Sequence, residues 1–130
     1  MKSLLLLVLL MLIPFSAAQA PDPHSIPAVD AELGPCSADF TITDTAGKPV
    51  YAAKVKVRVS YGLLSAHKLD LEVGTNVDGK ARITGLPSRL KKGLYFEASE
   101  SDRTGNAFDD PSNTCKTQFA ITLRKPPQAQ

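Results

Sequence analysis

The chain has 130 residues, with 15 Lys and Arg against 13 Asp and Glu, and a formal net charge of +2 at pH 7. This near-neutral balance disfavours nucleic-acid binding, for which a basic domain with clustered Lys and Arg is typical. The length and the hydrophobic content of 43% suffice for one packed core and not for two.

Residues 1–18 predict a secretory signal peptide. One lysine precedes an apolar run from Leu4 to Phe15, and small residues follow, which is the layout of such signals. The run is shorter than the roughly 20 residues that span a bilayer, and no second run follows, so we expect no transmembrane helix. Cleavage is expected after Ala18 or Ala20, and the protein is expected to be exported, to the periplasm or out of the cell.

Residues 19–35 hold four prolines and little apolar periodicity, so they predict an extended leader. Residues 126–130 are expected to form a disordered tail. Between them, residues 36–125 contain short segments in which apolar and polar residues alternate, separated by turn residues. That pattern predicts a single all-β sandwich domain.

Six segments carry this alternation, and we predict a strand in each. They cover residues 36–43, 54–61, 68–73, the stretch around Ala81 and Ile83, residues 94–99 and residues 115–124. The polar stretch 100–113, between the last two of them, is predicted to be a long loop. Period-two alternation places one face of each strand in the core and the other in solvent.

The two cysteines predict one disulfide. Cys36 shares its strand face with Phe40, and Cys115 shares its face with Phe119, so both sulfurs point toward the core. An even cysteine count in an exported chain favours a disulfide over a metal pair or a reactive thiol. The bridge would tie the starts of the first and last predicted strands.

Cations alternate with valines in residues 54–61, which raises the question of an anion site. If this strand forms a hairpin with the next one, a single register sets valines against leucines and places Arg58 opposite Asp70. The same register places Lys56 opposite Glu72. Cross-strand pairs of this kind contribute a few tenths of a kcal/mol up to about 1 kcal/mol. The row of cations is therefore predicted to be a solvated, charge-paired face.

Two loop clusters are weaker candidates for binding. Arg89, Lys91 and Lys92 lie in a predicted loop without interleaved aromatic residues, and a solvated loop is the expected reading. The second cluster has oxygen ligands that calcium accepts, in a spacing that matches no calcium-binding loop. Solvated turns are expected there too; the residues are Asp102, Asn106, Asp109, Asp110 and Asn113.

Two turn motifs resemble a known family. The first is D-x-x-G-x-P-V-x-x-A-x-V-x-V, formed by Asp44, Gly47, Pro49, Val50, Ala53, Val55 and Val57. The second is T-N-x-x-G-x-x-x-I-x-x-L-P followed by G-x-Y, formed by Thr75, Asn76, Gly79, Ile83, Leu86, Pro87, Gly93 and Tyr95. Together they resemble the carboxypeptidase-regulatory-like domain of exported bacterial proteins. The resemblance implies an immunoglobulin-like or prealbumin-like (transthyretin-like) antiparallel sandwich of about six to seven strands.

The residues do not predict an enzyme. A zinc peptidase needs H-x-x-E, whereas His67 is followed by Asp70 at that spacing, and the other histidine, His24, lies in the predicted leader. The chain also lacks the G-x-S-x-G elbow of many serine hydrolases. We therefore predict no catalytic residue, no metal ligand and no cofactor.

The predicted function is a non-enzymatic exported module that binds an envelope or extracellular partner, either protein or carbohydrate, or that serves as a structural part. Its ligand-binding residues are not assigned by the sequence. The alternatives are a purely structural periplasmic subunit and a small hydrolase with an unrecognised site.

Overall fold

The computed structural model describes residues 22–127, so the predicted signal peptide with both cleavage sites lies outside the described residues, as does most of the predicted tail. Within this range, no helix is long and apolar enough to cross a membrane. In chain order the elements are β1 (Ala28–Asp30), β2 (Cys36–Thr43), β3 (Lys54–Tyr61), the 3-10 turn η1 (Leu63–Ser65), β4 (His67–Gly74), β5 (Lys80–Leu86), β6 (Leu94–Glu100), β7 (Arg103–Asp109) and β8 (Lys116–Thr122).

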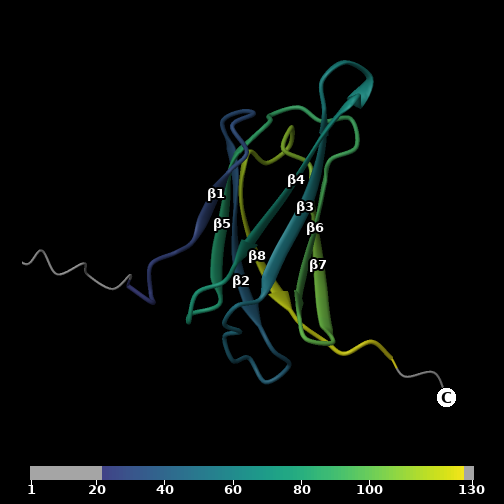
Figure 1. Cartoon of the computed structure of the whole chain (residues 1–130). Helices are drawn as coiled ribbons and strands as arrows, with labels where there is room; N and C mark the ends of the chain where they lie inside the picture. Colours follow the sequence, from purple (N-terminus) through teal and green to yellow (C-terminus); the bar gives the residue numbers. More distant parts are fainter. Residues whose placement is uncertain (1–21, 128–130) are drawn as a thin grey trace, which may run out of the picture.

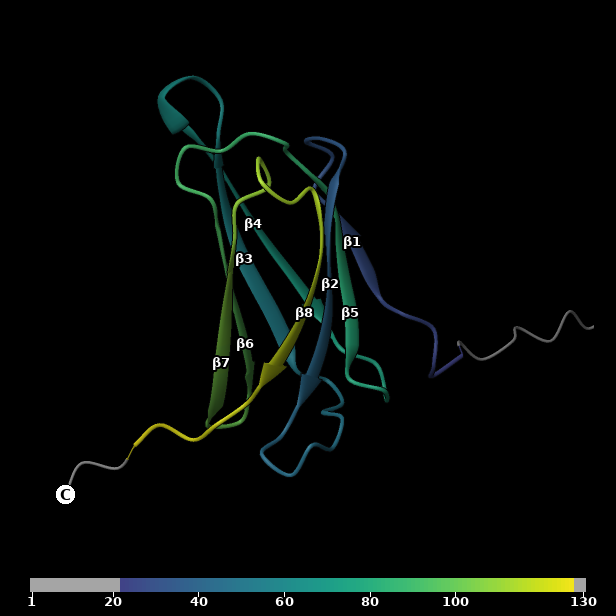
Figure 2. The ribbon, with the colours of Figure 1, turned by 180° about the vertical axis from the view of Figure 1, so that it is seen from behind.

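The strands form two four-stranded sheets packed face to face. One sheet has the order β1-β5-β2-β8 and the other has the order β4-β3-β6-β7 (Figures 1 and 2). The pairs β1–β5 and β2–β8 are parallel, and the other pairs are antiparallel. Along β3 the cations are exposed and the valines are buried, as two-residue alternation requires. The predicted all-β sandwich is confirmed.

An aromatic cluster joins the two sheets at the centre of the core. Phe40 on β2 lies with its ring centroid 5.0 Å from that of Phe96 on β6, across the sandwich. Phe119 on β8 lies 5.8 Å from Phe40 and 5.7 Å from Phe96. Aromatic pairs at such distances add to the free energy gained from burial alone. Three rings contributed by three strands thus form part of the core between the sheets.

The predicted hairpin register between β3 and β4 is confirmed. Arg58 lies opposite Asp70, and Lys56 lies opposite Glu72. Arg58 donates two hydrogen bonds to the Asp70 carboxylate, at 2.8 and 3.2 Å. The ion pair of Glu72, however, is formed with Lys54 at 3.7 Å rather than with the residue facing it. Lys56 therefore faces Glu72 but does not form the predicted ion pair with it.

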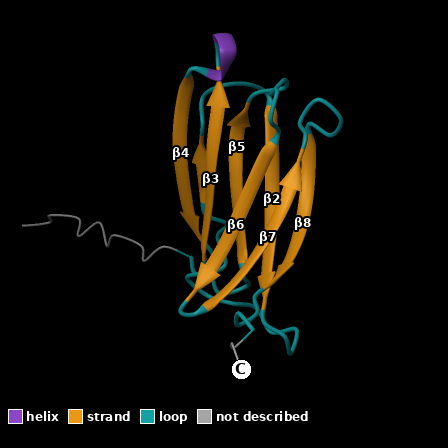
Figure 3. Ribbon diagram, turned by 90° about the vertical axis from the view of Figure 1, so that its right-hand side faces the viewer, coloured by secondary structure: helices purple, strands orange, loops and turns teal. Residues whose placement is uncertain are grey.

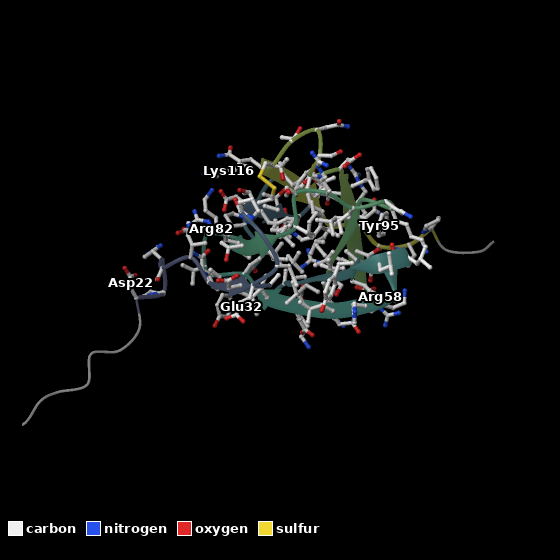
Figure 4. The ribbon with its side chains drawn as sticks, turned by 90° about the horizontal axis from the view of Figure 1, so that it is seen from above. Asp22, Glu32, Arg58, Arg82, Tyr95 and Lys116 are labelled. Carbon is white, nitrogen blue, oxygen red and sulfur yellow. A yellow bond between two sulfur atoms is a disulfide. The ribbon has the colours of Figure 1, made fainter. Side chains whose placement is uncertain are left out.

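The predicted disulfide between Cys36 and Cys115 is also confirmed, with 4.6 Å between the two Cα atoms. Cys36 is buried and is the first residue of β2, and Figure 4 shows the disulfide beside Lys116. Strands β2 and β8 are hydrogen-bonded neighbours, in parallel register from Ser37 opposite Lys116 onward. The bridge thus covalently ties strands from opposite ends of the sequence.

The segment predicted as a leader contains a strand, which is a correction to the boundary at residue 36. Residues 28–30 form β1 and pair in parallel with β5. The pairing is extended by the N–H of Arg82, which donates to the carbonyl of Pro27, and by the N–H of Ala31, which donates to the carbonyl of Thr84. Three residues are too few to show an alternation, so the pattern could not reveal this edge strand.

The segment predicted as a long polar loop contains β7, and the part of the chain that the structure describes has eight strands rather than about six to seven. The strand is hard to recognise because small residues, Gly105 and Ala107, take its inward positions. A Cβ on Gly105 would lie 2.5 Å from the Ile121 side chain and 2.7 Å from the Thr122 carbonyl oxygen. Glycine therefore allows β7 to approach β8, which brings the two sheets together at this edge.

Residues shared with the family motifs fasten the turns. The Thr75 hydroxyl donates to the carbonyl of Val50 at 2.6 Å and accepts from the N–H of Ala53 at 2.9 Å. The Asn76 side chain accepts from two N–H groups of its own turn. The Asp44 carboxylate does the same in the β2–β3 connection. These polar side chains satisfy backbone groups and carry no evident chemistry.

Candidate functional site

The outer face of the β4-β3-β6-β7 sheet gathers charged and aromatic side chains. In β6, Glu97 lies opposite Lys56 of β3, and Tyr95 lies opposite Phe108 of β7. Because successive residues alternate faces, all four side chains project from the outer side of the sheet. Figure 4 shows Arg58 and Tyr95 on this side of the molecule.

A hollow of about 460 Å³ lies on this face. Its charged and aromatic lining comes from β3, β4 and β6 and consists of Lys56, Arg58, Asp70, Glu72, Tyr95 and Glu97. The hollow is broad and open to water. The side chains of three neighbouring strands are thus within reach of one small ligand.

Two ion pairs neutralise part of this surface. The hydrogen bond between Arg58 and Asp70 raises the pKa of the guanidinium and lowers the pKa of the carboxyl group. Both side chains are largely exposed, so water screens their attraction. The second ion pair joins Glu72 to Lys54, which lies outside the hollow. Within residues 22–127, Lys56 and Glu97 have no ion-pair partner within 4 Å, although they face each other.

Two aromatic rings lie beside these charges in contact with solvent. Tyr95 is 55% exposed and Phe108 is 60% exposed. They are cross-strand neighbours, so their rings form one apolar strip at the β6–β7 side of the hollow. Sequence alternation marks Tyr95 as outward-facing, whereas Phe108 lies in the segment predicted as a loop and was missed as a candidate.

The acidic candidates of residues 100–113 do not converge. Asp102 lies in the β6–β7 turn and Asp109 ends β7, so the length of a seven-residue strand separates them, roughly 20 Å. Burial raises the pKa of Asp109, whose carboxylate accepts a hydrogen bond from Thr117 at 3.4 Å. In the part of the chain that the structure describes, no three His, Cys, Asp or Glu side chains are grouped to hold a metal ion.

The two histidines lie at opposite ends of β4. His67 begins that strand and stacks on Tyr61, with 5.3 Å between the ring centroids. His24 is bound to Asp78, in the turn that follows β4, with 2.8 Å between Nδ1 and Oδ2. Asn76 donates to the carbonyls of His24 and Ser25 and holds the same segment. Neither ring reaches the hollow, and both have local structural partners.

We expect the contact between His24 and Asp78 to depend on pH. The hydrogen bond to Asp78 raises the pKa of His24 above its ordinary value of 6.5. Because the folded-state pKa is raised, the stabilisation is complete below pH 6.5 and is lost as the pH rises through the raised pKa. In an NMR titration, Asp78→Asn should lower the His24 midpoint, whereas Asp102→Asn should not change it. An unchanged midpoint in Asp78→Asn would contradict the pairing.

No protein-family model and no curated protein matches the chain. Among solved structures, 3-chlorocatechol 1,2-dioxygenase from Rhodococcus opacus 1CP is similar at 14% identity, over 87% of this chain and 70% of that one, with a TM-score of 0.49. Catechol 1,2-dioxygenase from Acinetobacter radioresistens is similar at 16% identity, over 81% of this chain and 60% of that one, with a TM-score of 0.47. The enzyme from Pseudomonas arvilla C-1 is similar at 12% identity, over 80% and 60%, with a TM-score of 0.43.

These neighbours correct the predicted function. The sequence predicted a non-enzymatic module that recognises a protein or carbohydrate partner, whereas the similar solved structures are enzymes. We therefore withdraw that prediction. The chain spans 60% of the length of the two catechol 1,2-dioxygenases. At these identities and TM-scores the likeness assigns neither a reaction nor a reactive residue to this chain.

Proposed function

We propose that the chain binds a small zwitterionic molecule with an aromatic part, of the amino-acid class, in the hollow on the β4-β3-β6-β7 sheet. The observation that carries this is the facing pair Lys56 and Glu97, which form no ion pair with each other or with another described side chain. One cation and one anion are thus presented side by side to a ligand.

The charges fit the two ends of such a ligand. A ligand carboxylate would accept a hydrogen bond from the Lys56 ammonium, and a ligand ammonium would donate to the Glu97 carboxylate. Hydrogen bonds with an ionised partner are the stronger class. Arg58 does not compete for the carboxylate, because its guanidinium is engaged by Asp70.

The apolar part of the ligand fits the aromatic strip. Tyr95 lines the hollow, and Phe108 continues the strip on β7. A ring stacked on either side chain gains about 0.5–1.5 kcal/mol beyond the buried area. Since the hollow is open to water, we expect a dissociation constant of about 1 mM, which corresponds to about 4 kcal/mol.

The test uses three ligands that share one ring and differ in charge. L-phenylalanine carries both charges, phenethylamine carries the ammonium, and 3-phenylpropionate carries the carboxylate. We expect L-phenylalanine to bind about tenfold more tightly than either analogue, since each loses one charge-assisted hydrogen bond. Chemical-shift titration of the backbone amides should place the changes on β3 and β6.

Two variants, each of which neutralises one charged side chain, test the two charged contacts separately. Lys56→Gln should remove the preference for L-phenylalanine over phenethylamine, and Glu97→Gln should remove the preference over 3-phenylpropionate. Lys48→Gln, a matched change in the distant β2–β3 connection, should leave both preferences unchanged. The proposal is wrong if L-phenylalanine binds no better than the analogues, or if the shifts lie away from β3 and β6.

We propose separately that the protein is exported and that its sandwich is of the carboxypeptidase-regulatory-like type. The Cys36–Cys115 disulfide supports export, because such bonds persist in oxidising compartments. The hydrogen bonds of Asp44, Thr75 and Asn76 support a carboxypeptidase-regulatory-like sandwich, since these motif residues fasten the two turns that define it.

A further inference from the structure

The tip of the β3–β4 hairpin presents two leucines to solvent. Leu63 is 85% exposed and Leu64 is 79% exposed, more than the other large hydrophobic residues of the described range. Single exposed leucines are ordinary, but these two are adjacent at the outermost point of the fold. Figure 3 shows η1, which contains them, beyond the ends of the strands.

The backbone holds the leucines in this position. Leu64 and Ser65 have φ values of 56° and 55°, in the left-handed region that side chains with a Cβ rarely adopt. The turn is closed by hydrogen bonds at 3.1 Å, from Ser65 to Gly62 and from Ala66 to Leu63. The strain of this conformation is not offset by packing in the core, since none of the η1 residues is buried. Local strain that serves no packing points to a function of the tip.

Cations lie near the leucines at this end of the sandwich. Arg89, Lys91 and Lys92 are exposed in the β5–β6 loop, at the same end of the sandwich (Figure 1). This loop and the hairpin tip line one hollow of about 420 Å³, to which Ser65 and Lys91 both contribute. Lys68 adds a fourth cation at the start of β4.

These cations are available to a partner. In residues 22–127, none of the four has an ion-pair partner within 4 Å. Two carboxylates lie in the adjoining β7–β8 region. Asp109 is buried, and Asp110 accepts hydrogen bonds from the backbone N–H and the hydroxyl of Ser112. The surface around the leucines is therefore basic.

We propose that this tip docks onto the surface of an anionic lipid bilayer. Leu63 and Leu64 enter the boundary between headgroups and acyl chains, and the four cations contact the lipid phosphates. An apolar tip beside a cluster of cations complements an anionic surface over an apolar interior. The hollow on the outer face of the β4-β3-β6-β7 sheet takes no part in this docking, because its residues lie on the side of the sandwich and not at this end.

The test is co-sedimentation of the chain from Gln19 onward with lipid vesicles. Binding is expected to vesicles of equal parts phosphatidylcholine and phosphatidylglycerol, and to weaken when salt is added. Leu63→Ala with Leu64→Ala should weaken it about 100-fold, or about tenfold per leucine. Replacing Arg89, Lys91 and Lys92 by Gln should weaken it about fivefold per cation and reduce its salt dependence.

Matched controls lie at the other end of the sandwich. Tyr51→Ala removes an exposed apolar side chain and Lys48→Gln removes an exposed cation, and neither should change vesicle binding. All these positions are exposed, so the melting temperature should be unchanged in each variant. Equal binding by the leucine variant, or equal binding to pure phosphatidylcholine, overturns the proposal.

Insertion itself can be measured because the chain contains no tryptophan. Leu63→Trp places a single reporter at the tip, and its fluorescence should shift to the blue on anionic vesicles and be quenched by brominated lipid chains. Tyr51→Trp should show neither change. Sedimentation without a shift in Leu63→Trp shows attraction by charge alone and overturns the proposed insertion.

Discussion

Replacing Cys36 and Cys115 together by alanine lowers the melting temperature of the sandwich by roughly 20 °C, which is the result we expect from a loss of about 4–5 kcal/mol. The bridge closes a loop with a sequence separation of 79 residues. Without it, the unfolded chain gains the conformational freedom of that loop, while the folded sheet keeps the β2–β8 hydrogen bonds. The loss is a large share of the 5–15 kcal/mol by which domains of this size are stable.

The measurement is thermal unfolding followed by circular dichroism, with and without a reducing agent. The reducing agent should lower the melting temperature of the parent chain toward that of the double alanine variant and should not affect the variant itself. This second comparison separates the bridge from the small cavity left at the buried Cys36. Equal melting temperatures for the parent and the variant would contradict a stabilising role of the bridge.

The alternation of side chains predicted those parts of the fold that depend on neighbouring strands. The register of β3 with β4 followed from keeping valines opposite leucines, because a shift by one residue would bury Arg58. The inward direction of Cys36 likewise followed from its parity with Phe40. Such inferences need only one strand, or two strands joined by a hairpin.

Strands without an apolar alternation could not be predicted. Ala28–Asp30 becomes a strand only because the edge of β5 offers backbone groups to pair with. Arg103–Asp109 is a strand through its antiparallel pairing with β6, and the small inward residues Gly105 and Ala107 leave it without an apolar alternation. In both cases pairing with another strand decides the conformation, and a local pattern does not contain that partner.

The candidate site was beyond prediction for the same reason. Glu97 meets Lys56 through the pairing of β3 with β6, strands that are not consecutive in the sequence. The hairpin rule instead assigned Lys56 to Glu72, which pairs with Lys54. Phe108 belongs to the aromatic strip because residues 103–109 form β7, which the sequence pattern did not predict. The individual residues were visible in the sequence, but their grouping was not.

Phe40→Ala is expected to destabilise the sandwich by about 3–5 kcal/mol, the usual cost of removing a large ring from a well-packed core. Phe40 is buried and lies within 5.8 Å, between ring centroids, of both Phe96 and Phe119. Its removal opens a cavity between the two sheets, and the rigid strands on either side cannot collapse to fill it. Chemical denaturation should show a lower midpoint with the slope retained.

Phe108→Ala is the matched control, since it removes the same ring from the outer face of β7, where the side chain is 60% exposed. Surface changes of this kind stay within about 0.5 kcal/mol. Phe40→Leu keeps most of the volume and should fall between the two. If Phe40→Ala and Phe108→Ala cost the same, the Phe40 ring is not what joins the sheets. The contact between them would then rest on the other buried side chains of the core, such as Ile42, Ile83 and Leu123.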